Sequence, residues 1–131
     1  MNPKPPYDTL ILEGGSLRCA FTAGVMDALL LLGPLKFDRM FGVSAGSMVM
    51  ATYLSGQYKH FYRVSRELVE DGTFIRFSSA WSEEGLMNLS HLRAHVMRHA
   101  PLDLDALGVA QQSTQAIVVT THLETGEPRY I

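Results

Sequence analysis

A serine set between two glycines, in the pattern G-V-S-A-G around Ser44, is the part of this sequence that most directly suggests chemistry. It follows the apolar run Met40–Val43 and precedes Ala45–Leu54, so the sequence predicts a strand, a sharp turn and a helix. Gly42 and Gly46 suit a turn that leaves no space for side chains, and a helix N-terminus favours developing negative charge. This is the setting of a nucleophile for acyl transfer. The alternative is an ordinary turn in which Ser44 only caps the helix.

A second glycine-rich turn precedes this one by one strand and one helix. Thr9–Glu13 is a short apolar strand, Gly14 and Gly15 follow it, and Ala20–Leu32 has the character of a helix. Neighbouring glycines let the backbone approach a ligand and direct N–H groups toward it. A phosphate-binding loop is a poor explanation because the G-K-[ST] ending is absent, whereas an ordinary strand-to-helix turn stays open. The roughly thirty residues from Gly14 to Ser44 are the length of one βαβ unit, which would place both turns at the same edge of a sheet.

Together the two motifs resemble the patatin-like phospholipase family of serine acyl hydrolases. That family has an oxyanion loop of the form G-G-G-x-[RK]-G, followed at this spacing by a G-x-S-x-G elbow. The matching positions are Gly14, Gly15, Leu17, Arg18 and Ser44. The similarity continues through Phe21–Asp27, Tyr53–Gln57 and Val118–Ile131. Two positions depart from the pattern, since Ser16 and Cys19 stand where the loop has glycine.

The resemblance implies a three-layer α/β/α sandwich with a mostly parallel sheet, of which residues 1–131 would be the N-terminal part of one domain. It implies that Ser44 is the nucleophile and that Arg18 anchors the loop. It also implies a lipid or acyl-ester substrate, no cofactor and no metal, and it leaves peripheral contact with a membrane open. The residues expected to form the oxyanion hole are Gly14, Gly15, Ser16 and Ala45, and those of the elbow are Gly42 and Gly46.

The partner base of Ser44 is the missing part of the pattern. The family uses a Ser–Asp dyad whose aspartate lies in a downstream D-G-[GA] motif, which we expect to follow Ile131 in a longer chain. Asp71-Gly72-Thr73 comes too early and is better explained as the turn that closes a helix. The expected function is therefore a serine lipid hydrolase represented by an incomplete chain that is inactive alone. The alternatives are a G-x-S-x-G acyltransferase, an ordinary α/β-hydrolase or an inactive lipid-binding fragment.

Histidines form a second group with possible chemistry. His91, His95 and His99 recur every four residues on a stretch that Ser90 could cap, so they share one helix face. Metal binding is conceivable, but no E-x-x-H pairing accompanies them, and a solvated basic face is the preferred interpretation. His60 and His122 are candidate bases in principle.

Composition limits the classes of protein and partner. The chain has 131 residues, of which 47% are hydrophobic and 18% charged, and its formal net charge of -2 gives no reason to expect nucleic acid. The lone Cys19 suits a reducing compartment and no signal peptide is evident, so a cytoplasmic protein is expected. Gln57–Val69 predicts an amphipathic helix that packs on the protein or, as a second option, contacts lipid. Thr73–Gly85 has no clear period and is either a lid or a packed loop.

Overall fold

The computed structural model describes residues 8–75 and 87–131, and it contains a small sheet with helices against it. The strands are β1 (Thr9–Leu12), β2 (Arg39–Val43), β3 (Gln115–Thr121) and β4 (Pro128–Tyr130). The helices are α1 (Cys19–Leu32), α2 (Ala45–Leu54), α3 (His60–Asp71), α4 (Leu89–His99) and α5 (Leu104–Ala110), and a 3-10 turn, η1 (Ser16–Arg18), precedes α1. Among these described residues no helix is both long and apolar enough to cross a bilayer.

The sheet has the order β1-β2-β3-β4. β1 and β3 both pair in parallel with β2, and only β4 is antiparallel, because a short turn returns it along β3. The mostly parallel α/β architecture predicted from the sequence is confirmed. Parallel β1 and β2 bring their carboxyl ends to one edge, so the turns after Leu12 and Val43 are neighbours.

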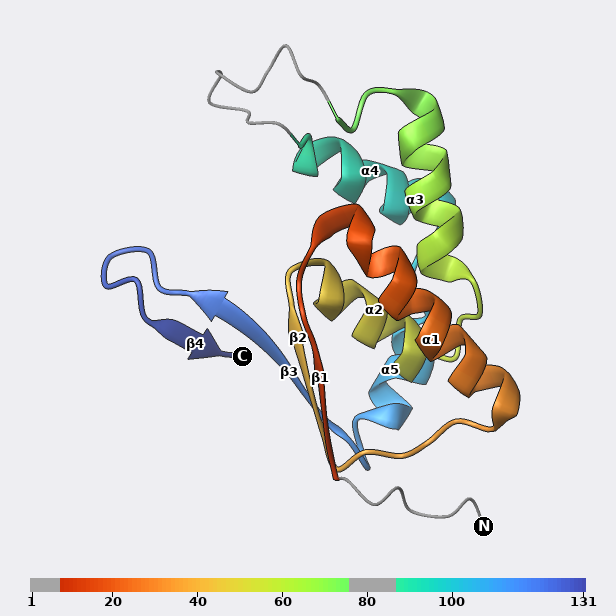
Figure 1. The fold of residues 1–131 in the computed structure, drawn as a ribbon, viewed down its shortest axis with the longest axis vertical. Coiled ribbons are helices and arrows are strands. Elements are labelled where there is room, and N and C mark those ends of the chain that lie inside the picture. Colours follow the sequence, from red (N-terminus) through yellow and green to blue (C-terminus); the bar gives the residue numbers. More distant parts are fainter. Residues whose placement is uncertain (1–7, 76–86) are drawn as a thin grey trace.

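One face of the sheet carries the core. Leu12 and Met40 are buried at 3% and 0% exposure, and they pack with Val49 of α2. Figure 1 shows the helices gathered on this side of β1, β2 and β3, while the β3–β4 hairpin extends away from them. Two of the three expected layers are thus present in the described residues.

The opposite face of the sheet has no helix against it in the described part of the chain. Alternation along the strands directs Ile11, Phe41 and Ile117 to this side, and these residues are register partners across the three parallel strands. Ile11 is 70% exposed. The ring of Phe41 lies edge-on to that of Tyr130, with the centroids 6.2 Å apart, so β4 gives this face part of its cover.

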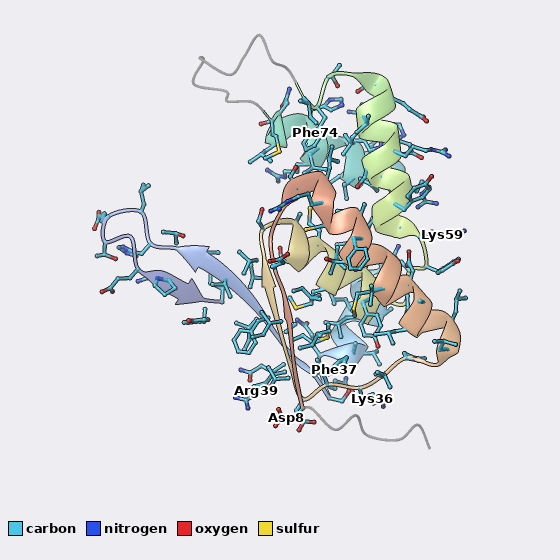
Figure 2. The ribbon with its side chains drawn as sticks, viewed as in Figure 1. Asp8, Lys36, Phe37, Arg39, Lys59 and Phe74 are labelled. Carbon is cyan, nitrogen blue, oxygen red and sulfur yellow. The ribbon has the colours of Figure 1, made fainter. Side chains whose placement is uncertain are left out.

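The two ends of the sheet differ in chemical character. Asp8, Lys36 and Arg39 lie at the amino ends of the strands, where the Asp8 carbonyl accepts hydrogen bonds from the Asp38 and Arg39 amides (Figure 2). Phe74 lies at the other end, buried beneath α3 and α4 (Figure 2). Asp8, Lys36 and Arg39 therefore lie at the end of the sheet away from the two glycine-rich turns.

The helices differ from the sequence predictions in three places. α3 begins at His60 rather than Gln57, and its predicted apolar face is buried at Phe61, Val64 and Leu68. The cap of α4 is Asn88, whose side chain accepts a hydrogen bond from the His91 amide, so the prediction of Ser90 as cap is wrong. α5 is a helix that was not predicted from the sequence.

Candidate active site

Ser44 occupies the sharp turn between β2 and α2 in a backbone conformation that L-residues rarely adopt. Its φ is 50° and its ψ is -125°, and its side chain is exposed. The side chain makes no cap hydrogen bond to the described residues of α2. Ser47 stabilises the turn instead. Its amide and its Oγ both donate hydrogen bonds to the Ser44 carbonyl oxygen, at 2.9 and 2.5 Å. This disfavours the capping interpretation of Ser44 and leaves its hydroxyl available for chemistry.

Glycines pack the turn tightly. A Cβ on Gly42 would lie 2.5 Å from the Ser47 α-carbon, and a Cβ on Gly46 would lie 2.5 Å from the Glu13 carbonyl oxygen. Both distances are far below ordinary van der Waals contact, so only glycine fits without movement of backbone. The start of α2 consequently rests directly on the end of β1.

The loop after β1 lies beside Ser44. A Cβ on Gly14 would be 3.1 Å from the Ser44 Cβ and 3.0 Å from the Val43 carbonyl oxygen. The structure therefore brings together the two motifs that lie about thirty residues apart in the sequence. Ala45, as the first residue of α2, has its amide at a helix N-terminus beside them.

Ser16 keeps the loop in a glycine-like shape although it is not glycine. Its φ is 51°, in the left-handed region, and its Oγ donates to Met87 Sδ at 3.2 Å. The Arg18 amide donates to the Gly15 carbonyl at 3.0 Å, which closes η1. The Arg18 guanidinium lies against Gly15. A Cβ added to Gly15 would be 3.4 Å from Arg18 Nε. The turn at Ser16 is thus held by hydrogen bonds from the Ser16 hydroxyl and the Arg18 amide.

Cys19, the second departure from the glycine pattern, is part of the core. Its thiol is 2% exposed and donates to the Glu13 carbonyl at 3.5 Å. Burial raises the pKa of this thiol, the charge of Glu13 raises it further, and Arg18 lowers it by a smaller amount. Cys19 is therefore a packing residue and a poor nucleophile.

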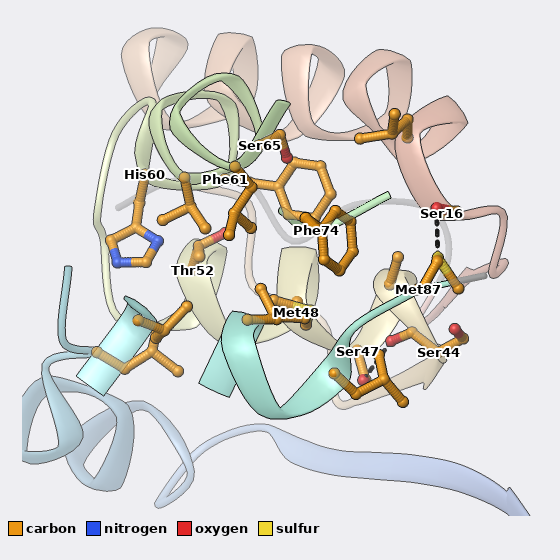
Figure 3. Close-up of a pocket in the computed structure, with 18 residues that line it drawn as sticks. Ser16, Ser44, Ser47, Met48, Thr52, His60, Phe61, Ser65, Phe74 and Met87 are labelled. Atoms are coloured by element: carbon orange, nitrogen blue, oxygen red, sulfur yellow. Dashed lines mark hydrogen bonds between the residues drawn. The ribbon is translucent and has the colours of Figure 1, made fainter. Parts of the chain in front are cut away.

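An apolar pocket begins at Ser44 and runs between α2, α3 and α4 (Figure 3). Its volume is about 310 Å³. Ser16, Ser44 and Met87 lie at one end, and His60 lies at the other. Most of the remaining lining is aliphatic or aromatic, and it includes Leu17, Met48, Phe61, Val64, Leu68, Phe74, Leu92, Val96 and Leu102. Of the segment Thr73–Gly85, for which a lid or a packed loop was expected, only residues 73–75 are among the described residues.

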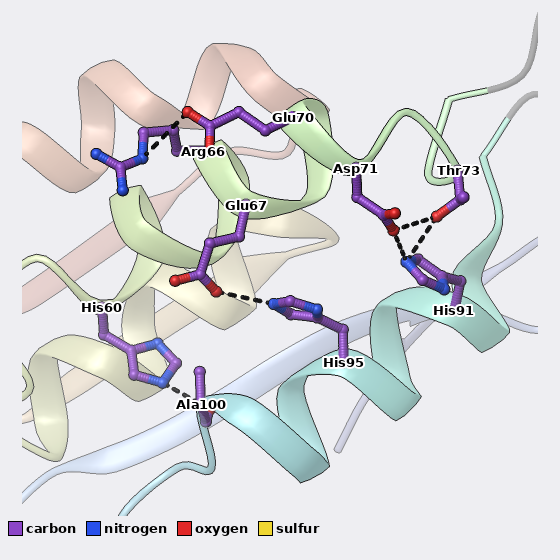
Figure 4. Close-up of polar contacts among 9 residues, drawn as sticks. All are labelled: His60, Arg66, Glu67, Glu70, Asp71, Thr73, His91, His95 and Ala100. Carbon is purple, nitrogen blue, oxygen red and sulfur yellow. Dashed lines mark hydrogen bonds and ion pairs between the residues drawn. The ribbon is translucent and has the colours of Figure 1, made fainter.

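The candidate bases within the described residues all have other partners. His60 lines the pocket, but its Nε2 lies 2.8 Å from the Ala100 carbonyl oxygen at the end away from Ser44 (Figures 3 and 4). His122 accepts a hydrogen bond at Nδ1 from the Thr125 amide in the hairpin. Asp71 ends α3, where the Thr73 hydroxyl donates to its carboxylate. Its neighbour Gly72 is left-handed at φ 68°, which confirms that this Asp-Gly pair closes a helix.

The three histidines of α4 share one face, as predicted, but that face is not simply solvated. His91 Nε2 lies 2.6 Å from a carboxylate oxygen of Asp71, and His95 Nε2 lies 2.9 Å from one of Glu67 (Figure 4). Both acids belong to α3, and a sequence pattern confined to α4 could not find them. The preferred interpretation of a solvated basic face is therefore wrong for these two residues, which tie α4 to α3. The described residues contain no cluster of three or more His, Cys, Asp or Glu arranged to hold a metal.

Comparison with known proteins gives a family match over most of the chain. The family model described as patatin-like phospholipase matches residues 10–124. The chain belongs to the patatin-like phospholipase family. No match was found to an individual protein of curated function or to a solved structure. This family hydrolyses lipid acyl esters, and the match spans both glycine-rich turns, α2 and the pocket helices.

Proposed function

We propose that this protein is a lipid acyl hydrolase with Ser44 as its nucleophile. The observation that carries the proposal is the backbone of Ser44, whose φ of 50° sets the residue on a tight turn directly against the loop at Gly14. Strained φ and ψ values cost about 1–3 kcal/mol and concentrate at functional sites, where the surrounding structure must hold them. Here Gly42, Gly46 and the Ser47 hydrogen bonds do so.

The expected chemistry has two steps. Ser44 Oγ attacks the ester carbonyl carbon as its proton passes to a base, and the carbonyl oxygen becomes an oxyanion. Backbone N–H groups of Gly14, Gly15, Ser16 and Ala45 are the candidates to hold that charge, with Arg18 keeping the loop in place. The C–O bond to the alcohol then breaks, the alcohol takes the proton, and water hydrolyses the acyl-serine in the same manner.

We assign the base to an aspartate outside residues 1–131, as partner of Ser44 in a Ser–Asp dyad. His60, His122 and Asp71 each hold other partners, which argues against all three. The sequence also contains no D-G-[GA] motif, since its single Asp-Gly pair is followed by Thr73. A serine hydroxyl without a base is a weak nucleophile at neutral pH, so residues 1–131 alone should hydrolyse esters close to the background rate.

The pocket supports an acyl substrate rather than a polar one. Most of its wall is aliphatic and aromatic, and Ser44 lies at one end of it. Burial of a hydrocarbon chain in such a wall is favourable by about 0.8 kcal/mol for each methylene group. This affinity directs a lipid ester, with its carbonyl at the serine, into the site.

A fluorophosphonate probe tests the nucleophile in the protein with its whole patatin domain. Wild-type protein should form an adduct on the peptide that contains Ser44, and Ser44→Ala should form none. Ser65→Ala is the matched control, because Ser65 lines the same pocket on α3 away from the loop, and it should be labelled like wild type. Equal labelling of Ser44→Ala and wild type would overturn the assignment.

The loop has its own test. Gly15→Val should lower kcat by roughly 10²–10³ for a lost oxyanion donor, with little change in KM. An increase in KM with unchanged kcat would mean that the Gly14–Gly15 turn binds substrate and does not stabilise the transition state.

A further inference from the structure

The pocket is bounded at both ends by residues that can be identified. At the near end the Ser16 hydroxyl donates to Met87 Sδ beside Ser44. At the far end His60 is 5% exposed, and its ring is fixed by the hydrogen bond to the Ala100 carbonyl. Figure 3 shows His60 and Thr52 on the side of the pocket opposite Ser44. The cavity therefore has a polar, buried wall where an acyl chain would end.

The length of the pocket follows from the helix that forms its floor. Ser44, which directly precedes α2, and Thr52 within it both line the pocket and are eight positions apart. At about 1.5 Å per residue this corresponds to about 12 Å. With C–C bonds of about 1.5 Å and bond angles near 111°, an extended hydrocarbon advances about 1.25 Å per carbon. About ten carbons therefore span the distance from Ser44 to the far wall.

The volume agrees with a ligand site. Pockets that bind small molecules are about 300–1,000 Å³, and this one is about 310 Å³. The pocket therefore has room for an acyl chain, and the length of that chain follows from the distance along the helix.

We propose that this pocket selects linear medium-chain acyl groups of about ten carbons and that His60 closes it to longer chains. The orientation of the chain, with its carbonyl at Ser44, rests on the proposed function. Binding of the chain itself does not. Additional methylene groups beyond the wall would either displace a buried, hydrogen-bonded ring or remain in water, and neither adds affinity.

Fatty-acid binding tests this without any need for turnover. Hexanoate, octanoate, decanoate, dodecanoate and hexadecanoate would each displace a dansyl-labelled fatty acid from the protein. Affinity should increase about fourfold per methylene as far as decanoate and then stop increasing or fall. A steady increase through hexadecanoate, or no displacement by any of these acids, would overturn the proposal.

Variants on α4 and α3 move the limit in opposite directions. Val96 lines the pocket one helical turn before Ala100, the residue bonded to His60, so Val96→Phe should move the break to octanoate or shorter. Met97→Phe adds an aromatic ring at an adjacent position that is 67% exposed and outside the pocket, and it should leave the break at decanoate. His60→Ala should move the break toward dodecanoate, which gives a second measurement if Val96→Phe does not fold. An unmoved break in folded variants of both kinds would overturn the role of the far wall.

The outcomes separate this proposal from the proposed function. If the break at decanoate is found while Ser44 forms no adduct with the fluorophosphonate, the pocket stands and the nucleophile assignment fails. If Ser44 reacts while affinity shows no break, the hydrolase stands and the length limit fails.

Discussion

Gly46 is the residue at which one added methyl group should do the most damage to this structure. A Cβ there would lie 2.5 Å from the Glu13 carbonyl oxygen, whereas ordinary contact begins at 3.4 Å. The Leu12 carbonyl oxygen, at the end of β1, would be closer still. The Gly46→Ala variant must therefore move α2 from the end of β1 by at least about 0.9 Å, the difference between these two distances. The atoms it meets are backbone and not the flexible end of a side chain, so the strain is not easily relieved.

Such overpacking costs about 1–3 kcal/mol, and we expect the upper half of that range. Gly24→Ala is the matched control, because Gly24 lies in α1 with nothing within 4 Å of the added Cβ. That change should stabilise the protein by up to about 1 kcal/mol, since alanine is the better helix former. Urea unfolding followed by circular dichroism measures both variants. With a slope of about 1–3 kcal/mol per molar, their midpoints should differ by about 1 M or more. Equal midpoints would refute the close contact between β1 and α2 on which the site depends.

Three further predictions concern single side chains. The Thr73 hydroxyl, and after it His91, hold the pKa of Asp71 below its ordinary value. The stabilising contribution of the Asp71 carboxylate is therefore present at neutral pH and is lost as the pH falls below about 4. The difference in stability between wild type and Asp71→Asn should shrink over that range, and a difference that grows there would contradict this. Ser44→Gly should be about 1–2 kcal/mol more stable than Ser44→Ala, because both variants remove the hydroxyl but only glycine relieves the strain of the positive φ. Matching unfolding curves for the two variants would show that the turn is unstrained. Iodoacetamide at pH 8 should modify Cys19 far more slowly in the native protein than in urea, since burial raises the pKa of its thiol, and similar rates by mass spectrometry would mean that the thiol is accessible.

The sequence was sufficient for the parts of this fold that depend on local pattern. The α2 helix was predicted at its observed bounds, since a strand, a glycine-flanked turn and an apolar helix follow one another around Ser44. The parallel pairing of β1 with β2 follows from one helix between two apolar strands. The close approach of Gly14 to Ser44 is a consequence of that pairing.

The missed features depend on contacts between distant segments or on weak local signals. His91 and His95 were expected to face water, but they pair with Asp71 and Glu67, which lie about twenty to thirty positions earlier in the chain. These partners come within reach only when α3 packs on α4, so a pattern within α4 alone could not predict them. The role of His60 as the far wall of the pocket had no signal in the sequence. α5 has seven residues, and its one indicator was Asp103, whose side chain accepts from the Ala106 amide as an N-cap.

A covalent acyl-enzyme on Ser44 is the most direct test of the central claim. The protein with its whole patatin domain would be mixed with p-nitrophenyl decanoate, quenched in acid during the first turnover and digested for mass spectrometry. We expect one decanoyl group on the peptide that contains Ser44, formed together with a burst of p-nitrophenol, and neither signal in Ser44→Ala. A burst of equal size in Ser44→Ala, or a decanoyl group on any other residue, would contradict the account.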